Sequence, residues 1–450
     1  MLYSQTSNGL NFAVEQEGQR VAYCALSIRC GTREEDVREC GRTKGGRFHS
    51  GTAHFVEHTL FKGTAGKSAG VINGYLEKLG GELNAYTTKE EIVLHSTVLK
   101  EDIEKAAGLL FELASRPTFP LREVETEKTV VIDEIASYKD SPADDIYDRF
   151  ESLLFEGHPL SGNVLGTPAS VKKITPEELQ FFVRTFFRPE LMAFTVVSPL
   201  ADAEAAKMVE RLSLKYFGKA GEDTGKGACE VGAAGDSEEC AEGMTRDGEN
   251  INAEERQTDI TPDFEGRIFS KTINRHSHQA NCIIGATAPS LRREKERIAT
   301  SVMVNILGGP ATNSRLNSKL REKKGWVYNV ECCYTQYADS GIVAVCFGCD
   351  RDKLDECIAA AGEEIERLQK VPLTPRSLKA AKKQLIGQLT VAAENGESQA
   401  LAMGKSLLAF GKVQSDDYTR RVIEEVTSED IQRAACEVFA PERLSTLIYL

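Results

Sequence analysis

The stretch that decides the fold is Gly51–Lys62, GTAHFVEHTLFK, which holds two of the seven histidines of the chain. On an α-helix, positions four apart share a face, so His54 and His58 can present two ring nitrogens to one metal ion. Glu57 lies on an adjacent edge of that face, where it can reach a water on the metal without being a ligand. The spacing predicts a zinc site with its own general base. The alternative is an amphipathic helix with two histidines and a solvated glutamate.

Two histidines leave a zinc ion short of a third protein ligand, which we expect on another rigid element. The HxxEH order reverses the better-known HExxH and is a zinc-protease motif. Downstream, ETEKTVVIDEIASYKD at 125–140 has helical periodicity, with Glu127 and Glu134 two turns apart on one face. One of these carboxylates could bind the metal while the other lies in its outer shell. A solvated acidic helix face is the alternative.

The composition is that of a globular protein, with 41% apolar and 27% charged residues in a chain of 450. This length predicts two to four domains. A net charge of −13 disfavours nucleic acid and anionic membrane as partners, because both require clustered basic residues. No apolar run is long enough to span a bilayer, and the N-terminal residues do not resemble a signal peptide. We therefore expect a soluble, cytoplasmic protein without a membrane association.

The twelve cysteines are expected to be free thiols in a reducing compartment, since many lie inside apolar, strand-like runs. Cys346 and Cys349 have CxxC spacing, but the strand-like VAVCF that leads into them favours a structural role over metal or redox chemistry.

The region 219–265 is rich in Gly, Ala, Asp and Glu and poor in large apolar residues, which predicts an acidic linker or insertion. It divides the chain into 1–218 and 266–450. Both halves run through a β-rich segment, a helix, a strand region and two further helices, as expected for distant copies of one plan. Hairpin-like connections predict an α+β fold, with two homologous α/β sandwich domains, each an antiparallel-rich sheet covered by helices.

Six segments in one order resemble the inverted zincins of the pitrilysin and insulinase type, especially the bacterial branch related to mitochondrial processing peptidase. They are GLNFAVEQ, GTREED, GTAHFVEHTLFKGT, ELNAYTTKE, ETEKTVVIDEI and GHPLSGNVLGT. The resemblance implies that His54, His58 and Glu134 bind one zinc ion. It also implies that Glu57 is the general base and that Glu127 is a supporting carboxylate.

The same resemblance extends to residues outside the motif. Asn84, Ala85 and Tyr86 match the strand to which an extended substrate adds; for Asn84, a turn before the strand is the alternative. In SRLNSKLREKKGWVYNV at 314–330, the resemblance implies that Arg321 and Tyr328 reach across a chamber toward the substrate. A charged helix face and a strand tyrosine are the alternative there. The second half has no HxxEH motif, and it is expected to bind no zinc.

Taken together, the resemblance implies a zinc endopeptidase that hydrolyses oligopeptides or unfolded segments inside an enclosed chamber. A chain with two such domains would form half of a clamshell, which a homodimer would complete; a heterodimer with an inactive paralogue and a monomer are the alternatives. The alternative is a catalytically silent subunit that serves a structural or substrate-binding role. The intact HxxEH motif favours the enzyme.

Overall fold

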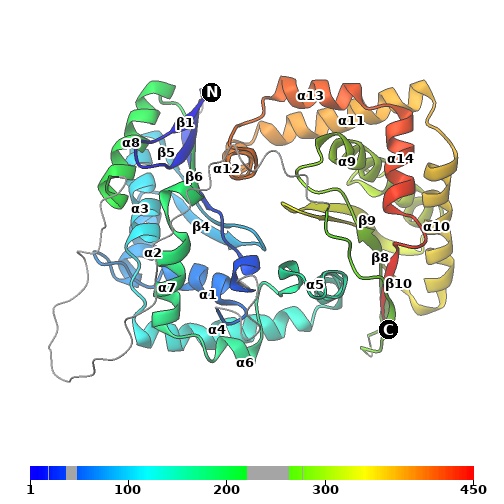
Figure 1. Ribbon diagram of the computed structural model, residues 1–450, viewed down its shortest axis with the longest axis horizontal. Helices are drawn as coiled ribbons and strands as arrows, with labels where there is room; N and C mark the ends of the chain where they lie inside the picture. The colour runs from blue at the N-terminus through cyan, green and yellow to red at the C-terminus, as the bar shows by residue number, and fades with distance from the viewer. Residues whose placement is uncertain (19, 37–47, 220–262, 276) are drawn as a thin grey trace, which may run out of the picture.

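Two β-sheets organise the computed structural model, which describes all residues except 19, 37–47, 220–262 and 276 (Figure 1). The first sheet has the strand order β1-β2-β6-β3-β5-β4, in which β2 and β6 are parallel and the other neighbours antiparallel. Its strands, in chain order, are β1 (Leu2–Gln5), β2 (Asn11–Gln16), β3 (Val21–Ile28), β4 (Glu82–Thr87), β5 (Ile92–Leu99) and β6 (Met192–Ser198).

The second sheet has the order β7-β11-β8-β10-β9, with β7 and β11 parallel and the remaining pairs antiparallel. Its strands are β7 (Ser270–Ile273), β8 (Gln279–Thr287), β9 (Val327–Gln336), β10 (Gly341–Asp350) and β11 (Ser445–Tyr449). Position by position, this order repeats β2-β6-β3-β5-β4 of the first sheet, with the parallel pair in the same place. The predicted α+β fold of two homologous, helix-covered sheets is therefore confirmed.

Fourteen α-helices surround these sheets in the part of the chain that the structure describes. The first half contains α1 (Thr52–Leu60), α2 (Ala69–Glu77), α3 (Ile103–Ser115), α4 (Leu121–Lys139), α5 (Pro142–Leu154), α6 (Pro168–Val171), α7 (Pro176–Phe186) and α8 (Asp202–Phe217). The second contains α9 (Glu294–Gly308), α10 (Leu354–Lys370), α11 (Pro375–Ala393), α12 (Gly396–Phe410), α13 (Asp416–Glu425) and α14 (Ser428–Val438). Proline at the first turn starts α11, as the sequence predicts.

Each lobe has its main core on one face of its sheet. In the first lobe, α1, α3 and α8 pack there, and Phe55, Leu110 and Phe194 are fully buried. In the second lobe, α9, α10 and α14 supply the corresponding layer over β8 and β10. Strand alternation explains the arrangement, because successive side chains point to opposite faces and the sheets need cover on both.

The other face of each sheet is covered by a helix from the other half of the chain. Helix α12 packs on β2, β3 and β6 of the first sheet, with Met403 and Leu407 buried against Ala25. Helix α5 packs on β8 and β11 of the second sheet, with Phe150 buried beside Leu447. Both helices lie between the two lobes (Figure 1). The two halves thus exchange one helix each.

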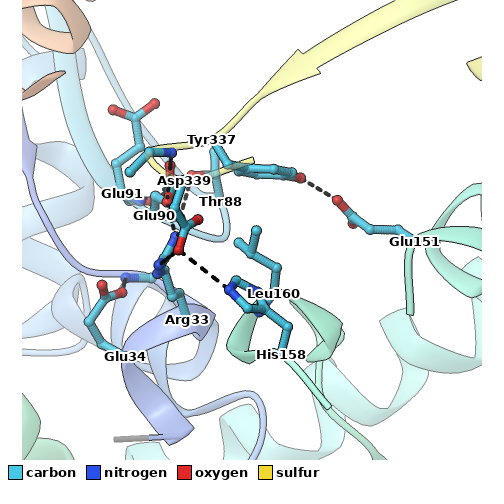
Figure 2. A network of polar contacts seen from close by, with 12 residues as sticks. Arg33, Glu34, Thr88, Glu90, Glu91, Glu151, His158, Leu160, Tyr337 and Asp339 are labelled. Atoms are coloured by element: carbon cyan, nitrogen blue, oxygen red, sulfur yellow. Dashed lines mark hydrogen bonds and ion pairs between the residues drawn. The ribbon is translucent and has the colours of Figure 1, made fainter. Parts of the chain in front are cut away.

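A network of ion pairs joins the lobes at the tip of the β9–β10 hairpin (Figure 2). Arg33, in the short helix η1 (Thr32–Asp36), donates an N–H from each terminal guanidinium nitrogen to Asp339, and its Nη1 lies 2.6 Å from Oε1 of Glu90. The backbone N–H of Ala338 donates to Oε2 of Glu90 at 3.1 Å, and His158 Nε2 lies 3.4 Å from Asp339. The turn between β4 and β5 is thereby tied to the second lobe.

Beside this network lies a second, buried group of charges. Lys89 Nζ is 2.7 Å from Oε2 of Glu151 on α5, and it also donates to the backbone oxygens of Leu160 and Gly162. The Tyr337 hydroxyl donates to the other oxygen of Glu151. All three ionisable groups are buried, so each depends on its partners for the hydrogen bonds that water would otherwise provide.

The domain boundaries 1–218, 219–265 and 266–450 stay a prediction, because most of 219–265 lies outside the described residues. The helix exchange shows that the two halves are not packed independently, because the clusters under α5 and under α12 each contain residues from both halves. No helix in the described ranges is long and apolar enough to cross a membrane.

Candidate metal centre

Helix α1 presents both histidines of the HxxEH motif from a firmly packed element. Phe55 and Val56 are fully buried in the core of the first lobe, which fixes the rotation of the helix about its axis. The rings of His54 and His58 have centroids 4.5 Å apart, and both emerge on the side that faces α4. His54 is buried and His58 is half-buried.

Glu134 of α4 completes a group of three potential metal ligands. Its Oε1 lies 3.9 Å from Nε2 of His54, and its Oε2 lies 3.4 Å from Nε2 of His58. One ligand atom from each residue lies within 4.8 Å of the other two. Within the described ranges, no other set of three such residues meets that criterion.

Glu127, two turns before Glu134 on α4, supports this group by contacting His58. Its Oε1 lies 3.0 Å from Nδ1 of His58, and its Oε2 lies 2.7 Å from Nζ of Lys62. Burial alone would raise the pKa of Glu127, but the hydrogen bonds from His58 and Lys62 outweigh burial and lower the pKa. Glu127 is therefore a carboxylate that accepts the Nδ1 proton of His58, and it leaves Nε2 of His58 directed at Glu134.

The donor set fits zinc. With the Nδ1 proton on the Glu127 side, neutral His58 turns an Nε2 lone pair toward Oε2 of Glu134, a buried oxygen without a hydrogen-bond donor in the described chain. A proton or a metal cation between these two atoms would satisfy both of them. Two imidazole nitrogens and one carboxylate oxygen also form a typical catalytic zinc set, which leaves a fourth position open.

The pKa values of the two histidines are shifted in opposite directions. Burial, together with the nearby charge of His58, lowers the pKa of His54 to about 3, so His54 is neutral and its ring can serve as a ligand. For His58, burial lowers the pKa, but the hydrogen bond to Glu127 and the charges of Glu57 and Glu134 raise it overall. The carboxylates around His58 therefore favour a positive charge beside its ring, which a proton or a metal ion next to Nε2, the atom that faces Glu134, would supply.

Glu57 is half-buried on the same helix and is not part of the ligand group. Burial raises its pKa, while the charge of His58 opposes that shift. The hydroxyl of Thr87, at the end of β4, donates to Oε2 of Glu57 at 3.4 Å. A carboxylate with a raised pKa beside this candidate ligand group meets the chemical requirement for a general base.

Asn84, Ala85 and Tyr86 lie on β4, which is the edge strand of the first sheet and pairs with β5 alone. Asn84 is exposed and lies within the strand, so the alternative of a turn is wrong; the other two are half-buried. An edge strand has a row of backbone groups that can pair with an added chain. Because α1 packs against β4 and Thr87 contacts Glu57, this edge runs beside the histidines.

Arg321 and Tyr328 belong to the second lobe. Arg321 is exposed in the π-helical segment η6 (Asn317–Lys323), and its ion-pair neighbour is Glu322 at 3.9 Å. Tyr328 on β9 is 86% exposed. Within the described chain, no hydrogen bond or ion pair joins either residue to the histidine group. Their predicted contact with a substrate stays a prediction.

Some contacts escaped the sequence reasoning. Thr87 and Lys62 match no motif position, although both lie inside segments that carry the family resemblance, ELNAYTTKE for Thr87 and GTAHFVEHTLFKGT for Lys62. The structure confirms a structural role for the CxxC pair. Cys346 packs in the core between α5 and the second sheet, whereas Cys349 packs in the core on the opposite face of that sheet. Those two thiols therefore do not form one site.

His276 lies outside the described residues, as do 37–47 of the long loop that precedes α1.

Solved structures share this fold across the whole chain. A protease from Helicobacter pylori has a TM-score of 0.81 at 18% identity and covers 100% of this chain and 98% of its own. A structure described as a peptidase M16 inactive domain, from Pseudomonas fluorescens, has a TM-score of 0.79 at 19% identity and covers 100% of this chain. The repeated, helix-covered sandwich is thus the fold of two-domain peptidases of this class.

Sequence comparison narrows the class to one family. Residues 11–168 match the model described as insulinase (peptidase family M16), and 173–385 match the M16 inactive domain. An uncharacterized zinc protease of Mycobacterium tuberculosis strain H37Rv is 30% identical over 386 residues, which is 86% of this chain and 81% of that protein. The uncharacterized zinc protease YmxG of Bacillus subtilis is 27% identical over 399 residues, with 89% and 88% covered. The chain belongs to the M16 peptidase family, which confirms the resemblance to the pitrilysin and insulinase type.

Proposed function

We propose that this protein is a zinc-dependent endopeptidase that cleaves oligopeptides or unfolded segments in the space between its lobes. One observation carries the proposal: ligand atoms of His54, His58 and Glu134 lie within 4.8 Å of one another. Glu57 lies on the same helix as the two histidines. The names of relatives, which call them zinc proteases, support the choice of metal.

In this proposal, zinc supplies a Lewis acid that lowers the pKa of water and polarises the peptide carbonyl. The carboxylate of Glu57 takes one proton from the attacking water as its oxygen bonds to the carbonyl carbon. Glu57 then gives that proton to the leaving amine nitrogen as the C–N bond breaks. Glu127 holds the ring of His58 through Nδ1, and Lys62 neutralises the second oxygen of Glu127.

The peptide would bind by adding a strand to β4. Backbone pairing along Asn84–Tyr86 gives affinity that depends little on the side chains, which suits varied substrates. Thr87 at the end of that strand contacts Glu57, so a peptide paired along β4 passes close to the base. Arg321 and Tyr328, presented from the second lobe, would donate hydrogen bonds to the carbonyl oxygen as it gains negative charge.

The test is elemental analysis of the purified protein together with hydrolysis of a mixed quenched-peptide library, with and without a chelator. We expect bound zinc and cleavage that the chelator abolishes and added zinc restores. Zinc without cleavage of any peptide would favour the silent-subunit alternative, or a requirement for a partner chain. Absence of zinc from protein refolded or dialysed with the metal would refute the proposal.

The oligomeric state can be measured on the same purified protein. We expect a homodimer, or a heterodimer with a paralogue, because a two-lobed chain leaves a bound peptide open on one side. Light scattering of the purified protein at several concentrations measures this directly. A monomer that cleaves peptides at the full rate would contradict the expectation of pairing and leave the zinc chemistry intact.

A further inference from the structure

Helix α1 begins only two residues before His54, so whatever fixes its N-terminus also fixes the first histidine. We propose that Glu35 is a positioning residue for the metal centre, acting by clamping the first turn of α1. This inference rests on the proposed binding of zinc by the two histidines and Glu134.

The first turn of α1 cannot cap itself. Its N-cap residue is Gly51, in the left-handed conformation with φ 90°, and no side chain of the turn caps the helix. A Cβ at Gly51 would lie 2.7 Å from the backbone oxygen of Leu165, so a capping serine or aspartate does not fit there. The first N–H groups of a helix need acceptors, and here these must come from elsewhere in the chain.

Glu35 of η1 supplies those acceptors. Its Oε2 accepts the N–H of Gly51 at 2.9 Å, and its Oε1 accepts the N–H of Ala53 at 2.7 Å. The side chain is 5% exposed, so water does not compete for these bonds. Burial raises the pKa of Glu35 to about 8, against the two N–H bonds, which lower it. In either protonation state both oxygens keep a lone pair for an N–H group.

The clamp acts directly beside a ligand. Ala53 is the residue before His54, so losing its bond to Glu35 frees the backbone that carries the first imidazole. The opposite side of the same turn is held by Glu178 of α7, which accepts from the His49 N–H at 2.7 Å and lies 3.1 Å from the Thr52 hydroxyl. The helix start is thus fixed from η1 and from α7.

Substitution Glu35→Gln provides the test, because the amide keeps the shape of the side chain while its nitrogen cannot accept an N–H bond. The matched control is Glu34→Gln, which removes a neighbouring half-buried carboxylate whose oxygen accepts from Gly31 and not from α1. Zinc affinity is measured by competition with a chelating dye. Metal geometry is read from the visible absorption of the cobalt(II)-substituted protein.

For Glu35→Gln we expect zinc affinity to fall by roughly 10–100-fold, as for other groups that support metal ligands, with shifted cobalt bands. Glu34→Gln should match the unsubstituted protein in both. Equal zinc affinity and superimposable cobalt spectra for Glu35→Gln would overturn the inference. If the amide variant does not fold, Glu35→Asp replaces it in the test. Its two acceptor oxygens sit on a side chain one methylene shorter, so we expect shifted cobalt bands, and spectra equal to those of the unsubstituted protein would overturn the inference.

The two proposals fail differently. If the unsubstituted protein binds neither zinc nor cobalt, the proposed metal centre is wrong and Glu35 has nothing to position. If the unsubstituted protein binds both metals and the Glu35 variants bind them equally well, the metal centre stands and the clamp alone is wrong.

Discussion

The two lobes share a five-strand topology, and among the described residues only the first lobe carries a candidate metal group. Aligning the two halves of the sequence places Gln388 opposite Glu134 and Ala381 opposite Glu127, on helices of the same length. Helix α4 buries Glu127 among apolar residues, whereas α11 has no buried residue. The sheet can therefore be built without the metal group, and the group depends on a few side chains added to a helix pair.

The two lobes also differ in the helix that follows the corresponding strands β3 and β8. In the first lobe this is the nine-residue α1, with its imidazoles facing α4. In the second it is the fifteen-residue α9, whose buried residues include Val302, Met303 and Leu307 but no histidine. One copy of the repeat thus carries candidate metal ligands at this position, and the other carries apolar side chains that pack in the core.

The largest expected effect comes from Glu134→Gln, which gives the first lobe the residue that the second lobe has. Removing a ligand should reduce zinc content after dialysis to less than about a tenth of that of the unsubstituted protein, with loss of cleavage. Asp133→Asn, an exposed neighbour on the same helix, is the control and should retain zinc. Full zinc occupancy in Glu134→Gln, measured by elemental analysis, would point to a different third ligand.

Glu57→Gln separates the base from the ligands. We expect unchanged zinc content and a fall in turnover of roughly 10²–10⁴-fold, the usual contribution of a general base. Glu77→Gln, an exposed carboxylate on α2, serves as the control in the same peptide assay. Turnover equal to that of the control would remove Glu57 from the mechanism.

Phe150→Ala tests whether the exchanged helices hold the lobes together. Phe150 is fully buried on α5 against the second sheet, so its truncation should lower the free energy of unfolding by about 3–5 kcal/mol. Leu121→Ala, at a side chain that is 63% exposed, should change it little. Denaturant unfolding measures both. A small loss for Phe150→Ala would mean that α5 contributes little to the second lobe.

Asp339→Asn tests the ion-pair network between the lobes, with an expected loss of about 1–3 kcal/mol for a charged hydrogen bond. Burial opposes the ionised form of Asp339, but the bonds from His158 and Arg33 outweigh burial, and the pKa is lowered. A lowered folded-state pKa means that the contribution is present above the unfolded-state pKa and is lost as pH falls further.

The loss of stability in Asp339→Asn should therefore be complete at pH 7 and shrink below about pH 4, near the pKa of an unfolded aspartate. Thermal melts of both proteins across that range measure the difference. A gap that stays constant down to pH 2 would show that Asp339 contributes through something other than its charge.

Much of the first lobe's site could be predicted from the sequence because helical spacing is local. The pairs His54/His58 and Glu127/Glu134 each lie on one helix, where periodicity fixes the shared face. That the two helices meet came from the family resemblance, and the structure brings the side chains together. Repeated element order likewise indicated two similar sheets before their topology was known.

The remaining contacts join segments that no local pattern connects. Glu35 caps a helix 16 residues away across a loop, and Thr87 reaches Glu57 from a neighbouring strand. The exchange of α5 and α12 was equally hidden, because an amphipathic helix reveals that it has an apolar face and not which sheet covers that face.

The position of α12 has a consequence for how the chain is made. The hydroxyl of Thr195 on β6 bonds to the backbone oxygen of Ala400 at 2.8 Å, across 205 residues of sequence. During synthesis the first sheet is complete long before its second cover leaves the ribosome, so the apolar face around Ala25 and Val93 stays uncovered meanwhile. The first lobe, which holds the histidine group, is therefore translated first, yet α12 can cover its sheet only after nearly the whole chain has been made. An apolar face that stays uncovered for that long can aggregate or bind chaperones.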